Sequence, residues 1–229
     1  QAAYVMPSHQ FPTGIVMPVK RRQELFSWAG ELPGRYLIED DYDSEFRYKG
    51  KPIPALQGMD QTGSVVYMGT FSKAIAPAIR VGYMVLPESL LSVYRKKGRF
   101  YSSTVSRVDQ RILANFISGG YFERNLNWMR EIYKGKHDVL LGALKPLEKR
   151  FEIKGEYAGL HVLLTDRKGE AEQALLAKAE EKKVRVYGLS GFCMEERRAK
   201  ESHTIVLGYA GLTEEEIRKG VELLREALE

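Results

Sequence analysis

Short, nearly all-apolar runs alternate with longer segments of helical periodicity through the first two thirds of the chain. Apolar runs bounded by glycine or proline are typical of strands that are buried on both faces, as in a parallel sheet. Such runs predict strands over 36–38, 64–68 and 81–86. Strands that alternate with helices indicate an α/β layer with a largely parallel sheet.

Four segments in the same part of the chain space their apolar residues as a helix does. The first begins at Pro18, whose fixed φ suits the first turn of a helix, and extends to Gly30. A turn-rich loop over 7–14, marked by two prolines and a glycine, precedes it. The other three helices are predicted over 87–98, 106–118 and 121–145. The last of these is long enough to bridge two domains.

The pattern changes after Pro146. Thr213 is expected to cap the last helix, with Glu216 completing a capping box. Strands are predicted over 160–164, 184–187 and 204–209, and helices over 170–182 and 213–228. These elements predict a small α+β lobe. We therefore divide the chain into a partial large domain over 1–144 and a small C-terminal domain over 145–229.

Net charge does not by itself indicate a nucleic-acid surface. A charge of +5 and a pI of about 9.1 favour contact with nucleic acid. However, the basic residues are mixed with acidic ones, as over 195–201, and no basic-aromatic nucleic-acid motif is present. This mixture of charges is more typical of solvated helix faces and loops than of a basic surface that binds the phosphates of a nucleic acid.

Composition narrows the class of protein further. No apolar run approaches the roughly 20 residues of a membrane-spanning helix, so we expect no membrane contact. The single cysteine, Cys193, cannot form an internal disulfide and fits a reducing cytoplasm. Four scattered histidines show no spacing typical of a metal site. The chain lacks an initiator methionine, and we expect it to be a fragment of a longer protein.

Asp40 and Tyr42 follow the first predicted strand in the acidic string 38–46. Side chains two apart on an extended backbone point to the same face, so a carboxylate and a phenol can approach one edge of a flat ring together. Pyridoxal 5′-phosphate needs a carboxylate to keep its ring nitrogen protonated and a donor for its ring oxygen. Taken without Lys73, Asp40, Asp41 and Asp43 are more typical of turn residues that cap a loop.

Lys73 follows the second predicted strand, at the end of Met68-Gly-Thr-Phe-Ser-Lys73. Its amine suits a Schiff base with that cofactor if neighbouring groups shield it. Thr70 and Ser72 supply hydroxyls, and Arg80 a guanidinium, for the phosphate. A lone lysine is usually a solvated residue and a lone arginine usually joins an ordinary ion pair. Together, these residues fit the cofactor better than chance placement does.

Four strings of this sequence together resemble the MocR-type regulators. These are GntR-superfamily transcription factors whose effector domain resembles fold type I aminotransferases. The spacing Asp-x-Tyr followed by Asp-Ser-Glu-Phe matches the GABA-responsive and vitamin-B6-responsive members most closely, whereas ordinary aminotransferases of the aminoadipate and kynurenine type tend to have Asp-x-x-Tyr. The strings that carry the resemblance are 8–14, 38–46, 67–73 and 80–87.

The resemblance implies a role for each residue of the candidate site. Lys73 would form the Schiff base, Asp40 would contact the pyridine nitrogen and Tyr42 the ring oxygen. The phosphate would be held by Thr70, Ser72 and Arg80. The loop over 9–14 takes the place of the Asn-Pro-Thr-Gly loop of aminotransferases, with Phe11 where the asparagine would be. A ring-oxygen contact is therefore missing, or comes from His9 or Gln10.

A second departure concerns the substrate carboxylate. Aminotransferases usually carry a carboxylate-binding arginine on the last strand of the small domain, where this chain has Val206. Arg185 is the substitute candidate, and an exposed strand residue is the equally weighted alternative. The glycine-rich phosphate loop, the stacking aromatic and the regulator's winged helix-turn-helix would all precede Gln1.

The sequence therefore predicts the effector domain of a MocR-type regulator. This domain would respond to an amino compound that replaces Lys73 as the amine bound to the cofactor. The intact protein would be a homodimer that binds DNA through its upstream domain. A true aminotransferase is one alternative, and a catalytically silent dimerisation module is another. GABA, pyridoxal phosphate itself, taurine and a D-amino acid compound all stay open as effector.

Overall fold

The computed structural model describes residues 1–194 and 202–229, and the charged string 195–201 lies outside the described residues. The chain forms two compact units. Unit 1 contains residues 1–10, 16–45 and 51–129, and unit 2 contains residues 11–15, 46–50 and 130–229. The division falls inside one long helix, and the predicted domain boundary at residue 144 stays a prediction.

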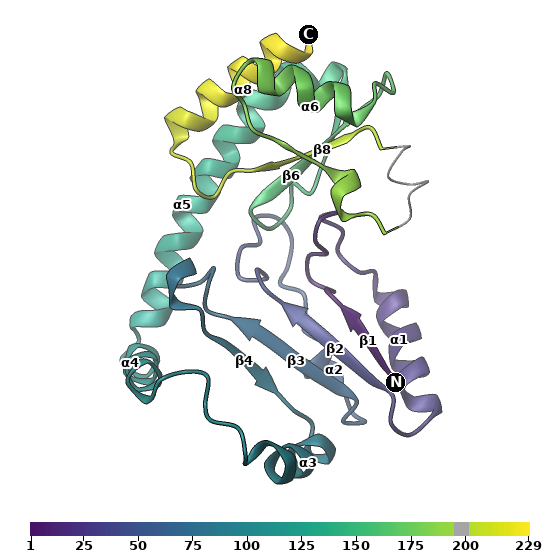
Figure 1. Cartoon of the computed structure of the whole chain (residues 1–229), viewed down its shortest axis with the longest axis vertical. Coiled ribbons are helices and arrows are strands. Elements are labelled where there is room, and N and C mark those ends of the chain that lie inside the picture. The colour runs from purple at the N-terminus through teal and green to yellow at the C-terminus, as the bar shows by residue number, and fades with distance from the viewer. Residues whose placement is uncertain (195–201) are drawn as a thin grey trace. The chain divides into compact units, whose positions relative to one another are not determined.

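Unit 1 is built on a four-stranded sheet, drawn in Figure 1. Its strands are β1 (Ala2–Val5), β2 (Tyr36–Asp41), β3 (Val65–Thr70) and β4 (Gly82–Val85), in that spatial order. The first three strands are parallel and β4 runs antiparallel to β3. The predicted α/β layer with a mainly parallel sheet is confirmed. Strand β1 was not predicted, because four residues with only partial alternation give a weak signal.

Helices α1 (Val19–Glu31) and α2 (Leu56–Met59) connect the parallel strands of unit 1. Helices α3 (Glu88–Gly98) and α4 (Arg107–Ser118) and the first part of α5 (Tyr121–Leu144) follow β4. Helix α1 packs on one face of the sheet, where Ala29 meets Leu37, Leu56 and Val65 in a small buried cluster. This packing follows from the alternation of β2, whose buried residues Leu37, Glu39 and Asp41 share that face.

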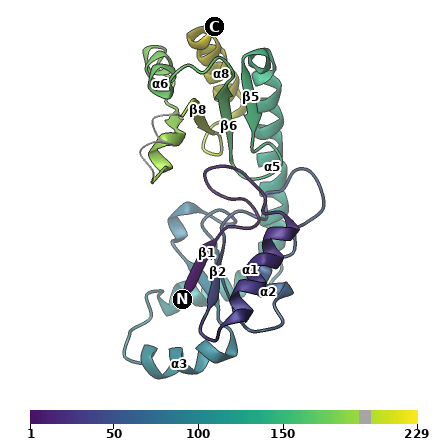
Figure 2. The ribbon, with the colours of Figure 1, turned by 90° about the vertical axis from the view of Figure 1, so that its right-hand side faces the viewer.

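Unit 2 is an antiparallel sheet covered by helices, as the second view shows (Figure 2). Its strands lie in the order β5-β6-β8-β7, with bounds Phe151–Lys154, His161–Asp166, Thr204–Gly208 and Tyr187–Gly188. Helices α6 (Glu172–Glu181) and α8 (Glu214–Leu228) and the end of α5 bury their apolar faces against β6 and β8. The predicted α+β lobe matches this arrangement. The capping box of Thr213 and Glu216 is present at the start of α8.

Two elements of unit 2 differ from the prediction. The strand predicted over 184–187 is reduced to Tyr187–Gly188, because the chain turns at Lys183 with a φ of 60° and only the last residues pair with β8. Strand β5 was not predicted. No helix among the described residues is long and apolar enough to cross a membrane.

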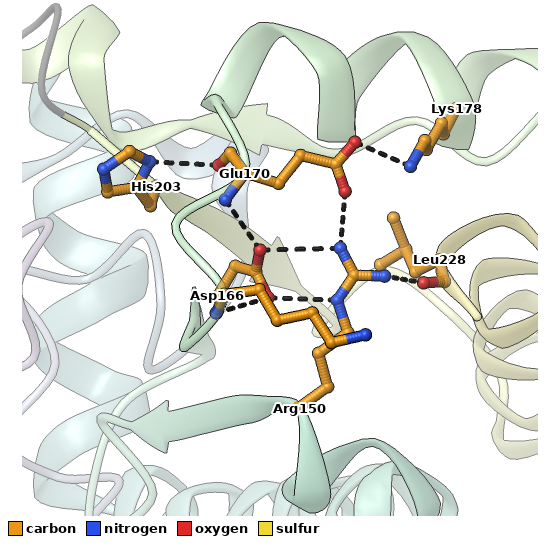
Figure 3. A network of polar contacts seen from close by, with 7 residues as sticks. Arg150, Asp166, Glu170, Lys178, His203 and Leu228 are labelled. Atoms are coloured by element: carbon orange, nitrogen blue, oxygen red, sulfur yellow. Dashed lines mark hydrogen bonds and ion pairs between the residues drawn. The ribbon is translucent and has the colours of Figure 1, made fainter.

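A polar network ties the strand end of β6 to the last turn of unit 2 (Figure 3). The guanidinium of Arg150 donates from Nε to Asp166 at 3.0 Å and from Nη2 to Glu170, and Nη1 donates to the carbonyl of Leu228. Lys178 pairs with the other oxygen of Glu170 at 2.6 Å. The hydrogen bond from Lys178 lowers the pKa of the Glu170 carboxyl. At Asp166 burial opposes ionisation, but the bonds from Arg150 and from backbone amides outweigh it and lower the pKa.

Candidate cofactor site

The carboxyl ends of β2 and β3 bring the predicted site residues of unit 1 to one edge of the sheet. These two strands are parallel, and Asp40 is aligned with Met68, two residues before Thr70. Because side chains alternate along a strand, Asp40 and Thr70 share one face, and Asp41 lies on the opposite face. Ligands of open α/β sheets bind at this end of the strands.

Asp40 accepts a hydrogen bond from the hydroxyl of Tyr4 on β1. Burial and this contact raise the pKa of Tyr4 to about 12. The sequence did not predict this partner, because it depends on β1 pairing with β2. Tyr4 is aligned with Ile38 in that pair, and the side chains of Ile38 and Asp40 point to the same face.

The Asp41 side chain lies on the opposite face of the sheet. Its buried carboxylate accepts hydrogen bonds from Ser44 at 2.7 Å and from Tyr67 at 2.8 Å. Burial and the Asp41 carboxylate raise the pKa of Tyr67, so that phenol stays a donor. Asp41 therefore supports the end of β2, whereas Asp40 belongs to the face that carries the other predicted site residues.

Tyr42 lies just beyond β2 and is half-buried. Its hydroxyl is 3.2 Å from Nδ1 of His9, and the same nitrogen is 2.8 Å from a carboxylate oxygen of Asp43. Burial, followed by the charge of Asp43, raises the pKa of Tyr42. The phenol therefore keeps its proton and can donate to a ligand oxygen, and its contact with the cofactor's ring oxygen stays a prediction.

Lys73 lies in the turn that follows β3. In this turn the hydroxyl of Thr70 donates to that of Ser72 at 3.1 Å, and the backbone amide of Ser72 donates to the Thr70 hydroxyl at 3.2 Å. The two hydroxyls predicted to contact phosphate are thus adjacent. Lys73 itself is exposed. The predicted shielding of its amine is therefore not seen among the described residues.

Arg80 adopts a left-handed backbone conformation, with φ 49° and ψ 35°. This conformation costs a non-glycine residue on the order of 1 kcal/mol or more and is concentrated at functional sites. Arg80 directly follows the short 3₁₀ turn Pro77–Ile79. It lies two residues before Gly82, which is aligned with Thr70. The strained turn therefore places the arginine near the hydroxyl pair.

Three residues of the prediction lie in unit 2. Arg185 is exposed, and its guanidinium carbon is 5.4 Å from the centre of the Tyr187 ring. Val206 is buried within β8. Phe11 packs edge-on against His161, at 5.4 Å between ring centres, and is therefore engaged in the packing of its own unit.

The donor set of unit 1 fits pyridoxal phosphate. A protonated phenol and a carboxylate suit the ring oxygen and ring nitrogen, an adjacent hydroxyl pair and an arginine suit the phosphate, and Lys73 offers an amine on the turn between them. The left-handed conformation of Arg80 at the end of its 3₁₀ turn is one that functional sites often contain.

Comparisons with known proteins support the fold and the cofactor. The family aminotransferase class I and II matches residues 5–224. The chain is 41 % identical over 225 residues to the uncharacterized HTH-type transcriptional regulator YhdI of Bacillus subtilis, across 98 % of this chain and 47 % of that protein. It is 33 % identical over 225 residues to the probable rhizopine catabolism regulatory protein MocR of Rhizobium meliloti, across 98 % and 45 %.

Solved structures give the same fold. LysN, the alpha-aminoadipate aminotransferase of Thermus thermophilus, was solved in complex with N-(5′-phosphopyridoxyl)-L-leucine. It superposes with a TM-score of 0.82 at 28 % identity, over 98 % of this chain and 58 % of that one. The chain thus spans about half the length of the relatives it matches. The predicted fold type I architecture and the resemblance to MocR-type regulators are confirmed, and the chain belongs to the aminotransferase class I and II family.

Proposed function

We propose that this chain is the pyridoxal-phosphate-binding, effector-sensing part of a MocR-type transcriptional regulator. The observation that carries the proposal is the grouping of Asp40, Tyr42, Thr70 and Ser72 at the ends of β2 and β3, next to the turn of Lys73. The similarity to HTH-type regulators along nearly the whole chain supports the regulatory role.

Each residue has a distinct task in this proposal. When bound, pyridoxal phosphate supplies a carbonyl that combines with amines and a ring that withdraws electrons. The amine of Lys73 holds the cofactor covalently, and Asp40 keeps the ring nitrogen protonated. Tyr42 donates to the ring oxygen. The Thr70–Ser72 pair and Arg80 hold the phosphate by hydrogen bonds and charge.

The effector is an amino compound that exchanges with Lys73. If the effector carries a carboxylate, Arg185 is the candidate to bind it, since Val206 offers no charge. A shift between the two units would then change how the intact protein binds DNA. In this proposal the intact protein is a cytoplasmic homodimer with an upstream winged-helix domain.

An aminotransferase is the second candidate. The superposition on LysN at 28 % identity favours it, because that protein carries the same fold and a phosphopyridoxyl ligand. Val206 argues against efficient turnover, because an amino acid without a carboxylate anchor is poorly oriented for proton removal at its Cα.

Labelling, operator-binding and turnover assays on the full-length protein separate these two functions. After loading with pyridoxal phosphate and reduction with borohydride, we expect a phosphopyridoxyl label on Lys73 and none in Lys73→Ala. Lys96→Ala, which changes an exposed lysine of α3, is the matched control and should label normally. Operator binding that changes with an amino compound, without rapid turnover of amino and keto acids, supports the regulator. Rapid multiple turnover supports the enzyme, and a label that persists in Lys73→Ala rejects the site.

A further inference from the structure

A buried histidine and a buried aspartate flank the phenol of the candidate site. His9 and Asp43 are each about 2 % exposed, and they join at 2.8 Å through Nδ1 and Oδ2. The sequence suggested His9 only as a direct contact to the cofactor ring. In the structure Nδ1 of His9 faces Asp43 and the hydroxyl of Tyr42.

The position of His9 is fixed from a second side. His9 lies in the loop before α1, and Arg22 of α1 is buried beneath that loop. The Arg22 guanidinium donates to the carbonyl oxygens of Pro7 at 3.0 Å, Met17 at 3.1 Å and Pro54 at 2.6 Å. Two of these bonds hold the ends of the loop, at Pro7 and Met17, and the third fixes the loop to the segment before α2. The imidazole of His9 therefore has a firmly held backbone.

The distances show which groups share this cluster. When Nδ1 of His9 carries a proton, it donates that proton to the Asp43 carboxylate, which is the nearer of its two partners. The Tyr42 oxygen, at 3.2 Å, receives the weaker share of the same proton as an acceptor. The Tyr42 hydroxyl also hydrogen-bonds to the Asp43 carboxylate. His9 and Tyr42 therefore compete for that carboxylate, and a proton donated by His9 leaves the hydroxyl hydrogen of Tyr42 available to a ligand. The negative groups around Tyr42 are Asp43, Asp40 and Asp41, and they favour the protonated phenol.

We propose that His9 and Asp43 form a positioning pair that orients the Tyr42 hydroxyl toward the ring oxygen of bound pyridoxal phosphate. The proposal rests on the proposed function, since it needs the cofactor in the site. It assigns no contact between His9 and the cofactor. Its consequence is that His9 and Asp43 influence the cofactor only while Tyr42 carries a hydroxyl.

A double-mutant cycle on the full-length, cofactor-loaded protein tests this dependence. The readout is the pH midpoint at which the absorption of bound pyridoxal phosphate changes. A bond donated by Tyr42 holds electron density on the ring oxygen, so the Lys73 nitrogen gives up its proton at lower pH. Tyr42→Phe should therefore raise the midpoint, by roughly one pH unit if one hydrogen bond to a charged group is lost.

His9→Leu and Asp43→Asn should each raise the midpoint in the same direction, by on the order of half a pH unit. In the Tyr42→Phe background, neither should add a further shift. His9→Asn keeps an N–H close to the place of Nδ1 and should restore most of the wild-type midpoint. His137→Gln is the control, because His137 is equally buried but bonded to the backbone of Glu156 in unit 2, and it should leave the midpoint unchanged.

Additive shifts of His9→Leu and Tyr42→Phe would overturn the proposal, since they would indicate that His9 contacts the cofactor itself. A wild-type midpoint in both His9→Leu and Asp43→Asn would overturn it as well. If His9→Leu fails to fold, Asp43→Asn supplies the same cycle. Failure of the proposed function looks different, because the wild-type protein would then carry no borohydride-reducible label on Lys73 at all.

Discussion

Asp40→Asn and Asp41→Asn should have opposite consequences, although the two aspartates are neighbours in the sequence. Asp40 lies on the face of β2 that carries the candidate site, and its one described hydrogen bond comes from the exposed Tyr4. An asparagine can still accept that bond. Asp40→Asn therefore leaves the free energy of unfolding within about 0.5 kcal/mol of wild type, but it removes the charge that faces the ring nitrogen.

The size of the binding defect follows from the lost charge. A hydrogen bond to a charged group contributes roughly 1.5–3 kcal/mol. Pyridoxal phosphate should therefore bind about tenfold to a hundredfold more weakly to Asp40→Asn. Asp41→Asn should instead destabilise the fold by about 1–3 kcal/mol, because its amide oxygen can accept the two hydroxyls but its NH2 group would be buried without an acceptor, in place of Oδ1. Its cofactor affinity should stay close to wild type.

Two measurements on the full-length protein separate the effects. Urea denaturation of the cofactor-free protein gives the free energy of unfolding, and spectrophotometric titration with pyridoxal phosphate gives the affinity. Equal losses of affinity in the two variants would refute the assignment of the two carboxylates to opposite faces. A large loss of stability in Asp40→Asn would refute it too.

The remaining predictions concern unit 2 and the chain as a whole. Arg185→Ala should weaken the response to a carboxylate-bearing effector roughly tenfold to a hundredfold while the label on Lys73 persists, and an unchanged response would leave Arg185 as a surface residue. Arg150→Met should lower the free energy of unfolding by about 3 kcal/mol, since it leaves Asp166 buried without its cation, whereas Lys178→Ala should cost less than about 1 kcal/mol. The folded-state pKa values of Asp166 and Glu170 are lowered, so their contribution is present above the unfolded-state values and should be lost as the pH falls below about 4; acid denaturation of wild type and Arg150→Met should show that difference shrinking. This chain alone should bind DNA only weakly and without sequence preference, with affinity falling steeply as salt rises, and a specific operator footprint would contradict that expectation.

Local patterns in the sequence determined most of the elements and the chemistry of the site. The apolar runs of β2 and β3, the helical spacing of α1 and the capping box of α8 depend on residues within a few positions of one another, so they can be recognised without a partner. The same holds for the pairing of Asp40 with Tyr42 two residues later. These short-range relations were sufficient to name the cofactor and the family that the comparisons then confirmed.

Only the tertiary structure decided which groups these residues contact. The bond from Tyr4 to Asp40 requires β1 to join the sheet, and the contact of His9 with Asp43 joins residues 34 positions apart. The antiparallel direction of β4 could not be predicted from the sequence either, because an apolar run has the same composition in either direction. Long-range pairing sets all three, since a chain of given local pattern can place its strands in several registers and only the packed core selects one.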